Sequence, residues 1–161
     1  MAKEIIYWDS CVFIAWLSNE VRTPAEMSGM EEVARLFDGN KIVLVTSVLS
    51  RVETLYGLMT KEAENKYIEV LSRPNLDEIE VHRDIAQLAH EIRSHYKSKG
   101  KKTPTTVDAI HIATAIWAKV DELHTFDGCG KQPGMITLNG DEILNGLKIM
   151  APNAKQPTLG F

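Results

Sequence analysis

Four acidic side chains interrupt or directly follow apolar segments of this sequence. They are Asp9, Glu53, Asp108 and Asp127, and they come from widely separated parts of the chain. A carboxylate beside an apolar core is costly unless it is paired or binds a cation. Carboxylates gathered in one crevice also repel one another and raise each other's pKa values, a conflict that a divalent cation removes. Because all-oxygen ligands suit Mg²⁺ or Mn²⁺ better than Zn²⁺, the four residues predict a magnesium or manganese site.

Each of these acids also has an explanation that needs no metal. Asp9 can cap the helix that follows it, Asp108 can complement a helix dipole from the first turn, and Asp127 forms a common turn pair with the glycine after it. Glu53 interrupts an apolar helical stripe, so its alternative is an ion pair with a buried arginine. What favours a shared site is the occurrence of all four in one small chain.

Strand and helix patterns alternate along the sequence. This alternation predicts a parallel sheet covered by helices on both faces, and ligands collect beyond the carboxyl ends of the strands in such sheets. Asp9 and Asp127 both fall at expected strand ends. The expected strands are 4–8, 42–45, 76–81, 122–126 and 135–138, and the expected helices are 10–18, 30–38, 47–59, 61–72, 83–97 and 107–119.

Length and composition fit one ordinary globular domain. The chain has 161 residues and a formal net charge of −4, so an anionic polymer has to be met by a local basic patch or through bound cations. Residues 1–150 are expected to form the domain and 151–161 an extended or disordered tail. The two isolated cysteines, the lack of a signal-peptide pattern and the lack of an apolar run of roughly 20 residues favour a reduced, cytoplasmic setting away from membranes.

The segments around the four acids resemble the motifs of PIN domains, specifically the VapC-like toxin branch. They occur in that family's order and approximate spacing over residues 4–138. An aspartate at the end of the first strand is followed by a small polar residue and a helix, and the last motif is a strand ending in Thr-x-Asp. The four segments are 7–14 (YWDSCVFI), 47–53 (SVLSRVE), 108–115 (DAIHIATA) and 123–127 (LHTFD).

The resemblance implies a three-layer α/β/α fold with a central parallel sheet. It also implies an endoribonuclease that depends on Mg²⁺ or Mn²⁺ and cuts RNA phosphodiester bonds. VapC-like proteins are commonly homodimers and are paired with an antitoxin that blocks the site. The implied partners are therefore an RNA substrate, an antitoxin protein and a second copy of the chain.

In metal-dependent hydrolysis of a phosphodiester, each candidate residue has an expected role. Asp9, Asp108 and Asp127 are expected to be direct ligands, and Glu53 to bind the metal through water or to orient the attacking water. Ser10 and Thr125 are expected to hydrogen-bond those waters.

Two departures from the family pattern leave other functions open. Many relatives carry a further acidic or polar residue soon after the last aspartate, whereas no carboxylate follows Asp127 here until Asp141. This difference puts a second metal position in doubt. The chain is also somewhat long for a toxin. The alternatives are an RNA-processing PIN nuclease without an antitoxin, and a PIN-like module that binds RNA or protein without cutting it.

Three further features have two interpretations each. The basic loop with Lys99, Lys101 and Lys102 can meet substrate phosphates or can simply be a solvated loop. His111 lies one helical turn after Asp108 and is expected to be a satisfied helix histidine rather than a base or ligand. Cys11 lies among apolar neighbours, which would raise its pKa, so it is expected to be a small core residue rather than a nucleophile.

Overall fold

The computed structural model describes residues 2–54 and 59–153 of the chain. Within these ranges a five-stranded sheet has the order β3-β2-β1-β4-β5, and every neighbouring pair of strands is parallel. The arrangement confirms the α/β fold with a central parallel sheet. The strands are β1 (Glu4–Trp8), β2 (Ile42–Ser47), β3 (Leu76–Ile79), β4 (Glu122–His124) and β5 (Lys148–Met150).

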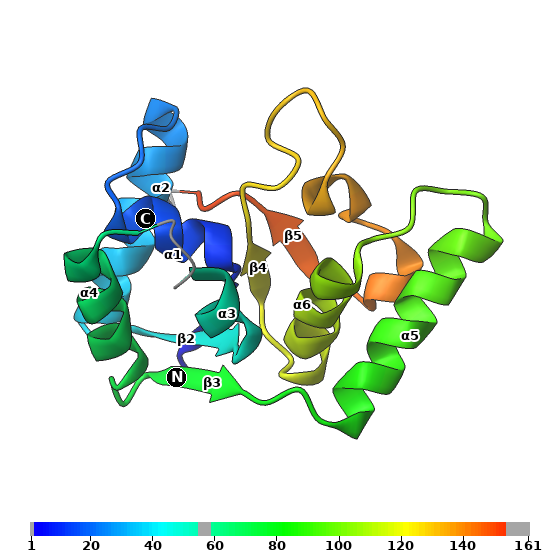
Figure 1. Cartoon of the computed structure of the whole chain (residues 1–161), viewed down its shortest axis with the longest axis horizontal. Coiled ribbons are helices and arrows are strands. Elements are labelled where there is room, and N and C mark those ends of the chain that lie inside the picture. Colours follow the sequence, from blue (N-terminus) through cyan, green and yellow to red (C-terminus); the bar gives the residue numbers. More distant parts are fainter. Residues whose placement is uncertain (1, 55–58, 154–161) are drawn as a thin grey trace, which may run out of the picture.

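Helices cover both faces of this sheet (Figure 1). Three of them pack with one another on one side and two on the other, and a short helix, α3, packs against α1. The first group is α1 (Ser10–Leu17), α2 (Pro24–Asp38) and α4 (Lys61–Leu71), the second is α5 (Arg83–Ser98) and α6 (Thr106–Trp117), and α3 covers Leu49–Thr54.

The alternation of side chains along β1 divides the core into two halves. Ile6 and Trp8 are fully buried on the face covered by α1, where the Trp8 ring meets Phe13 edge to face. Tyr7 points to the opposite face and packs with the apolar side of α6, including Ile112. A strand that is buried on both faces in this way belongs in the middle of a parallel sheet.

β1 lies in the middle of the sheet, and the order in which the strands are added reverses next to it. Strands β2 and β3 lie on one side of β1, and β4 and β5 lie on the other. The Asp9 backbone N–H donates to the carbonyl of His124 at 3.1 Å, so the ends of β1 and β4 are tied together. Ligand sites in open parallel sheets form in the crevice at such a switch point.

The helix predicted at 30–38 begins earlier than expected, at Pro24. The Thr23 side chain accepts a hydrogen bond from the N–H of Glu26, and proline follows it at the first helical position. Both are recognised helix-start signals, so the helix also includes residues 24–29, which lie outside the predicted range.

The strand predicted at 135–138 is wrong. Residues Met135–Leu138 form a 3₁₀ helix, and Lys148–Met150 supplies the fifth strand. The Met135 N–H donates to the Asp127 side chain and the Ile136 N–H to the Asp127 carbonyl, which ties this segment to the turn after β4 rather than to the sheet. The helix predicted at 47–59 is observed over Leu49–Thr54, and 55–58 lie outside the described residues.

The last described residues pack beside α2. A Cβ atom built on Gly29 would lie 2.2 Å from the carbonyl oxygen of Pro152, so only glycine permits this close contact. Of the tail predicted over 151–161, residues 154–161 lie outside the described residues. No helix in the part of the chain that the structure describes is long and apolar enough to cross a membrane.

Candidate metal centre

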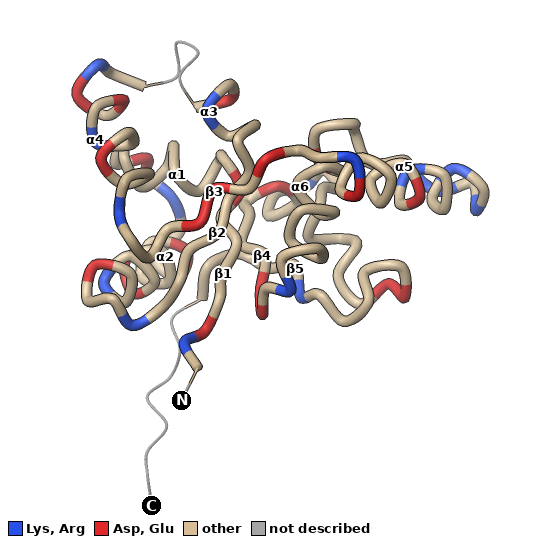
Figure 2. Tube along the Cα trace, turned by 90° about the horizontal axis from the view of Figure 1, so that it is seen from below, with Lys and Arg blue, Asp and Glu red and all other residues tan. Residues whose placement is uncertain are grey.

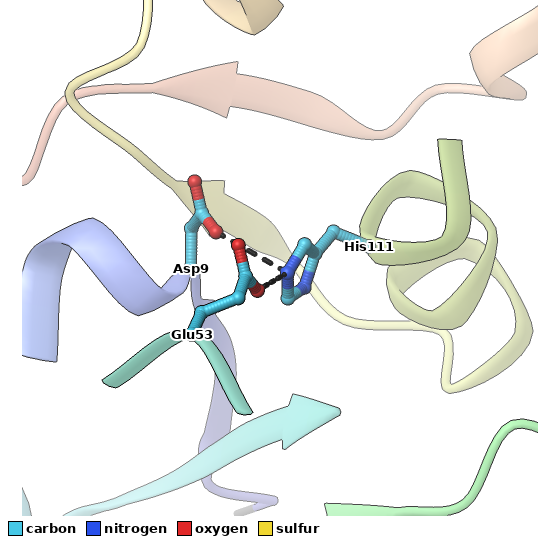
Figure 3. A group of neighbouring side chains, drawn as sticks. All are labelled: Asp9, Glu53 and His111. Atoms are coloured by element: carbon cyan, nitrogen blue, oxygen red, sulfur yellow. Dashed lines mark hydrogen bonds and ion pairs between the residues drawn. The ribbon is translucent and has the colours of Figure 1, made fainter. Parts of the chain in front are cut away.

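Three potential metal ligands meet where β1, α3 and α6 converge. Asp9, Glu53 and His111 each offer one ligand atom, and these atoms all lie within 4.8 Å of one another. The His111 Nε2 atom is 2.6 Å from Glu53 Oε1 and 3.5 Å from Asp9 Oδ1. Figure 3 shows the three side chains pointing toward one another from separate segments of the fold.

The Asp9 carboxylate is held in place through both of its oxygens. Oδ1 accepts from the Ser10 N–H at 2.7 Å, so Asp9 does cap α1. Oδ2 accepts from the Thr125 hydroxyl at 2.9 Å, and the Cys11 thiol lies 3.4 Å from the same oxygen. Asp9 can therefore cap α1 and also belong to the cluster, because a carboxylate oxygen has lone pairs for more than one partner.

Thr125 joins the ends of the first and fourth strands. Its hydroxyl oxygen donates to Asp9 and also accepts from the Asp127 N–H at 3.1 Å. Ser10 and Thr125 both contact the Asp9 carboxylate directly, and their contact with metal-bound waters stays a prediction. Such partners fix the direction in which a carboxylate points.

His111 is fully buried and uses both ring nitrogens. Nε2–H donates to Glu53, and Nδ1 lies 2.5 Å from the hydroxyl of Tyr7. The expectation of a satisfied helix histidine holds for its hydrogen bonds, but its partner is one of the four acids. The alternative for Glu53, an ion pair with a buried arginine, is not what the described residues show, since neighbouring Arg51 pairs with Glu78.

The surroundings of His111 and Tyr7 set their protonation. Burial lowers the pKa of His111, but the hydrogen bond that His111 donates to Glu53 and the charges of Asp9, Glu53 and Asp108 outweigh burial, and the net shift is upward. Burial raises the pKa of Tyr7 well above its ordinary value, and the charges of Asp9 and Glu53 add to the rise. Tyr7 is therefore a neutral phenol that can donate to, or accept from, the imidazole.

Asp108 and Asp127 line a pocket next to these three residues. Asp108 stands in the first turn of α6, where its N–H donates to the capping hydroxyl of Thr105. Burial raises the pKa of Asp108, and the negative charges of Asp127 and Asp9 raise it further. The electrostatic coupling places Asp108, Asp127 and Asp9 in one acidic region. The group within 4.8 Å, however, contains only Asp9 and Glu53 of the four predicted acids.

The remaining predicted residues divide between the site and the surface. Lys99, Lys101 and Lys102 are all exposed, and Lys102 also lines the same pocket as Asp108 and Asp127. The Cys11 thiol accepts from the N–H of Phe126, and burial followed by the charge of Asp9 raises its pKa. Cys11 therefore stays protonated, as expected for a packing residue.

Sequence comparison assigns the chain to a family. A sequence model described as PIN domain matches residues 6–128. The chain belongs to the PIN domain family. No curated protein sequence matches at a significant level.

Several solved structures share the fold at low sequence identity. VapBC2 from Rickettsia felis, bound to a promoter DNA fragment, aligns with a TM-score of 0.62 at 16% identity, covering 90% of this chain and 96% of that one. VapC20 from Mycobacterium tuberculosis, a toxin that cleaves the sarcin-ricin loop, aligns at 0.57 and 18%, covering 76% and 90%. FitAcB from Neisseria gonorrhoeae aligns at 0.55 and 18%, covering 91% and 97%.

Two contacts of the site were not predicted from the sequence, namely the hydrogen bond of His111 to Glu53 and that between His111 and Tyr7. His111 lies one turn from Asp108 on the same helix, whereas Tyr7 sits within an apolar strand. Its alternation with Ile6 and Trp8 is the signal that places it on the α6 side of the sheet.

Proposed function

We propose that this PIN domain is an endoribonuclease dependent on Mg²⁺ or Mn²⁺, and that it is the toxin of a VapBC-type toxin–antitoxin pair. The observation that carries the proposal is the cluster of Asp9, Glu53 and His111 at the carboxyl end of β1, with Asp108 and Asp127 beside it. Metal-dependent nucleases are typical of this family.

The side chains present fit a hard divalent cation. Carboxylate oxygens dominate the donor set, and the single imidazole already has both nitrogens in hydrogen bonds. Such a set suits Mg²⁺ or Mn²⁺ rather than a metal that needs several nitrogen or sulfur ligands. We propose that Asp9, Asp108 and Asp127 hold the ion, with Glu53 binding through water or orienting the attacking water.

Each residue of the site has a defined task in this proposal. The metal supplies Lewis acidity at the phosphate and a bound water of lowered pKa. Thr125 and the Ser10 N–H keep the Asp9 carboxylate oriented. His111, braced by Tyr7, holds Glu53 in position through the 2.6 Å hydrogen bond, and its raised pKa favours a positive charge that offsets the surrounding acids.

The proposed partners are an RNA substrate, an antitoxin protein and a second copy of the chain. One of the similar structures, VapBC-5 from Mycobacterium tuberculosis, is described as a member of the VapBC family of toxin–antitoxin systems, which supports an antitoxin. Homodimerisation remains a prediction from the family resemblance.

The direct test is cleavage of total RNA with Mn²⁺, with Mg²⁺ and with a chelator. Loss of an outer-shell partner of a metal site typically costs about 10–100-fold, so Asp9→Asn, which alters a proposed ligand itself, should slow cleavage by more than about 100-fold. Asp77→Asn is the matched control, because Asp77 is an exposed aspartate in β3 away from the site. Cleavage by Asp9→Asn at the wild-type rate would contradict the proposed site.

The toxin role needs a separate test in cells. Expression of the wild-type protein should arrest growth, Asp9→Asn should not, and co-expression of the neighbouring gene's product should restore growth. Metal-dependent cleavage without any growth arrest would instead favour the RNA-processing nuclease.

A further inference from the structure

A pocket of about 230 Å³ opens directly beside two of the acids. Asp108 and Asp127 belong to its lining, and the other lining residues come from the segments 102–105 and 133–138. Pockets for drug-sized ligands usually measure roughly 300–1,000 Å³, so this one has the size for a ring system rather than for a whole nucleotide.

The walls of this pocket are mainly apolar and its rim is polar. Pro104, Met135 and Leu138 contribute apolar surface, and Met135 is almost completely buried. Thr105 and Thr137 add hydroxyl groups. Bases that leave a stack are held by apolar or aromatic faces and by hydrogen bonds to their edges, and this lining offers both.

Asp127 holds the segment 134–136, which contributes to the pocket lining, in place. Asp127 Oδ2 accepts from the Met135 N–H at 3.0 Å, and the Asp127 carbonyl accepts from the Ile136 N–H at 3.1 Å. Gly134 packs so closely on Asp127 that an added Cβ would lie 2.3 Å from its Oδ1 atom. The pocket is therefore preformed, and its position relative to the acids is set by covalent and hydrogen-bonded links.

A second, more basic pocket adjoins the first through Thr103, which lines both. Arg93 and Lys97 line this second pocket, and Arg93 donates to the carbonyl of Pro104 at 3.0 Å. Figure 2 shows Lys and Arg positions gathered at the far end of α5 and in the loop after it. Lys102 stands between this basic end and the acids, with its Nζ atom 3.5 Å from the Pro133 carbonyl.

We propose that the pocket bounded by Pro104, Met135 and Thr137 receives one unpaired nucleobase of the RNA strand, adjacent to the phosphodiester at the acids. The phosphates on that base's other side run past Lys102 toward Arg93 and Lys97. The inference rests on the proposed nuclease function and adds to it the subsite that selects where the strand is cut.

The lining of the pocket favours a base in this position over a further phosphate. The ion proposed at Asp108 and Asp127 serves the phosphodiester that is cut, which leaves Lys102 as the one basic side chain among the lining residues. An uncharged ring needs no counter-charge and gains from burial against Pro104, Met135 and Leu138. Arg93 and Lys97 line the adjoining second pocket, where a backbone phosphate is attracted.

The test combines a pocket-filling substitution with removal of the base. Thr137→Trp places a large ring in the pocket, and Gln132→Trp adds the same ring at an exposed position outside the lining. Cut sites are first mapped on a random-sequence RNA pool. Oligonucleotides are then made with an abasic ribose at each position flanking the cut.

One abasic position should lower the wild-type kcat/KM by roughly 5- to 150-fold, the range expected for one stacked base. Thr137→Trp should lower kcat/KM on the intact oligonucleotide by a similar factor. On the abasic oligonucleotide Thr137→Trp should have the same kcat/KM as the wild type, because the new ring and the base occupy one site. Gln132→Trp should stay close to wild type. Losses that multiply, or a Thr137→Trp variant with unchanged kcat/KM, would overturn the subsite.

Failure of the nuclease function is distinguishable from failure of the subsite. If the wild-type protein cuts no RNA with either metal, the proposed function fails. The pocket is then tested by fluorescence anisotropy with a labelled single-stranded RNA and its abasic counterpart. Weaker binding of the intact strand to Thr137→Trp alone, with no change for the abasic strand, supports the base site, and equal binding to all variants overturns it.

Discussion

At the scale of single residues, the site depends on hydrogen bonds that hold carboxylates rather than on the carboxylates alone. Asp9 is fixed by Thr125 and the Ser10 N–H, and Glu53 is fixed by His111, which in turn contacts Tyr7. A metal ligand held in this way loses little freedom when an ion binds. Residues that never touch the ion are therefore expected to influence its affinity.

Tyr7→Phe tests this expectation. The change leaves His111 Nδ1 buried with one partner fewer, which should cost about 1–3 kcal/mol of stability. It should also weaken Mn²⁺ binding and slow RNA cleavage by about 10–100-fold, as seen when outer-shell partners of metal sites are removed. Urea unfolding and a Mn²⁺ titration of the cleavage rate measure the two effects.

Tyr96→Phe is the matched control for this prediction. Tyr96 is also buried, and its hydroxyl donates to Asp141 at 2.6 Å, away from the acids. A similar loss of stability without a change in Mn²⁺ dependence is expected. If both variants cleave RNA like the wild type, the brace formed by Tyr7 has no role in the site.

The acids were predictable from sequence, and their hydrogen-bond partners were not. A carboxylate next to an apolar run stands out locally, because its burial needs an explanation. The bonds of His111 to Tyr7 and Glu53 join residues separated by 104 and 58 positions. No local pattern encodes such distant pairs, and only the packing of α6 over β1 and beside α3 reveals them.

At the scale of elements, the segment from Gly128 to Gly134 shapes the pocket next to the acids. Gly128 has φ of +101°, and Gly128 and Gly134 lie in close contact with each other. The following 3₁₀ helix receives its position from two hydrogen bonds to Asp127. The loop and the acid therefore depend on each other's geometry.

Gly134→Ala should disturb this connection, whereas Gly130→Ala should not. The new Cβ at position 134 would lie 2.3 Å from Asp127 Oδ1, but nothing lies within 4 Å of a Cβ at position 130. Overpacking of this kind costs about 1–3 kcal/mol. Urea unfolding should show the loss for Gly134→Ala only, accompanied by slower RNA cleavage. Equal stability of the two variants would mean that the loop adjusts freely.

The elements that carry strong periodicity were predicted well, and the weak ones were not. The buried run of β2 and the amphipathic pattern of α5 gave bounds close to the observed ones. The segment 135–138 has the apolar character of a strand, but its N–H groups bond to Asp127. The true edge strand, β5, buries only one side chain, so its pattern in the sequence is faint.

At the scale of the whole molecule, a metal bound between β1, α3, α6 and the end of β4 would join segments from across the fold. A ligand that binds only the folded state stabilises it by about 2.7 kcal/mol at 100 times its Kd. For a protein of this size, that amounts to a rise in Tm of roughly 5–10 °C.

Saturating Mn²⁺ should therefore raise the Tm of the wild-type protein and leave that of Asp9→Asn nearly unchanged. Differential scanning calorimetry with Mn²⁺, with Ca²⁺ and with a chelator measures the effect without any need for activity. Asp77→Asn should respond like the wild type. An equal rise for Asp9→Asn would place the ion elsewhere.

The order in which the strands lie has a consequence for the protein during its own synthesis. β1 leaves the ribosome before its neighbour β4 and before the acid at position 127, which come much later in the sequence. Until that later part has been made, a nascent chain carries Asp9 with no complete centre to put it in. Any chemistry that requires the whole set of acids therefore begins only after residue 127 has been added.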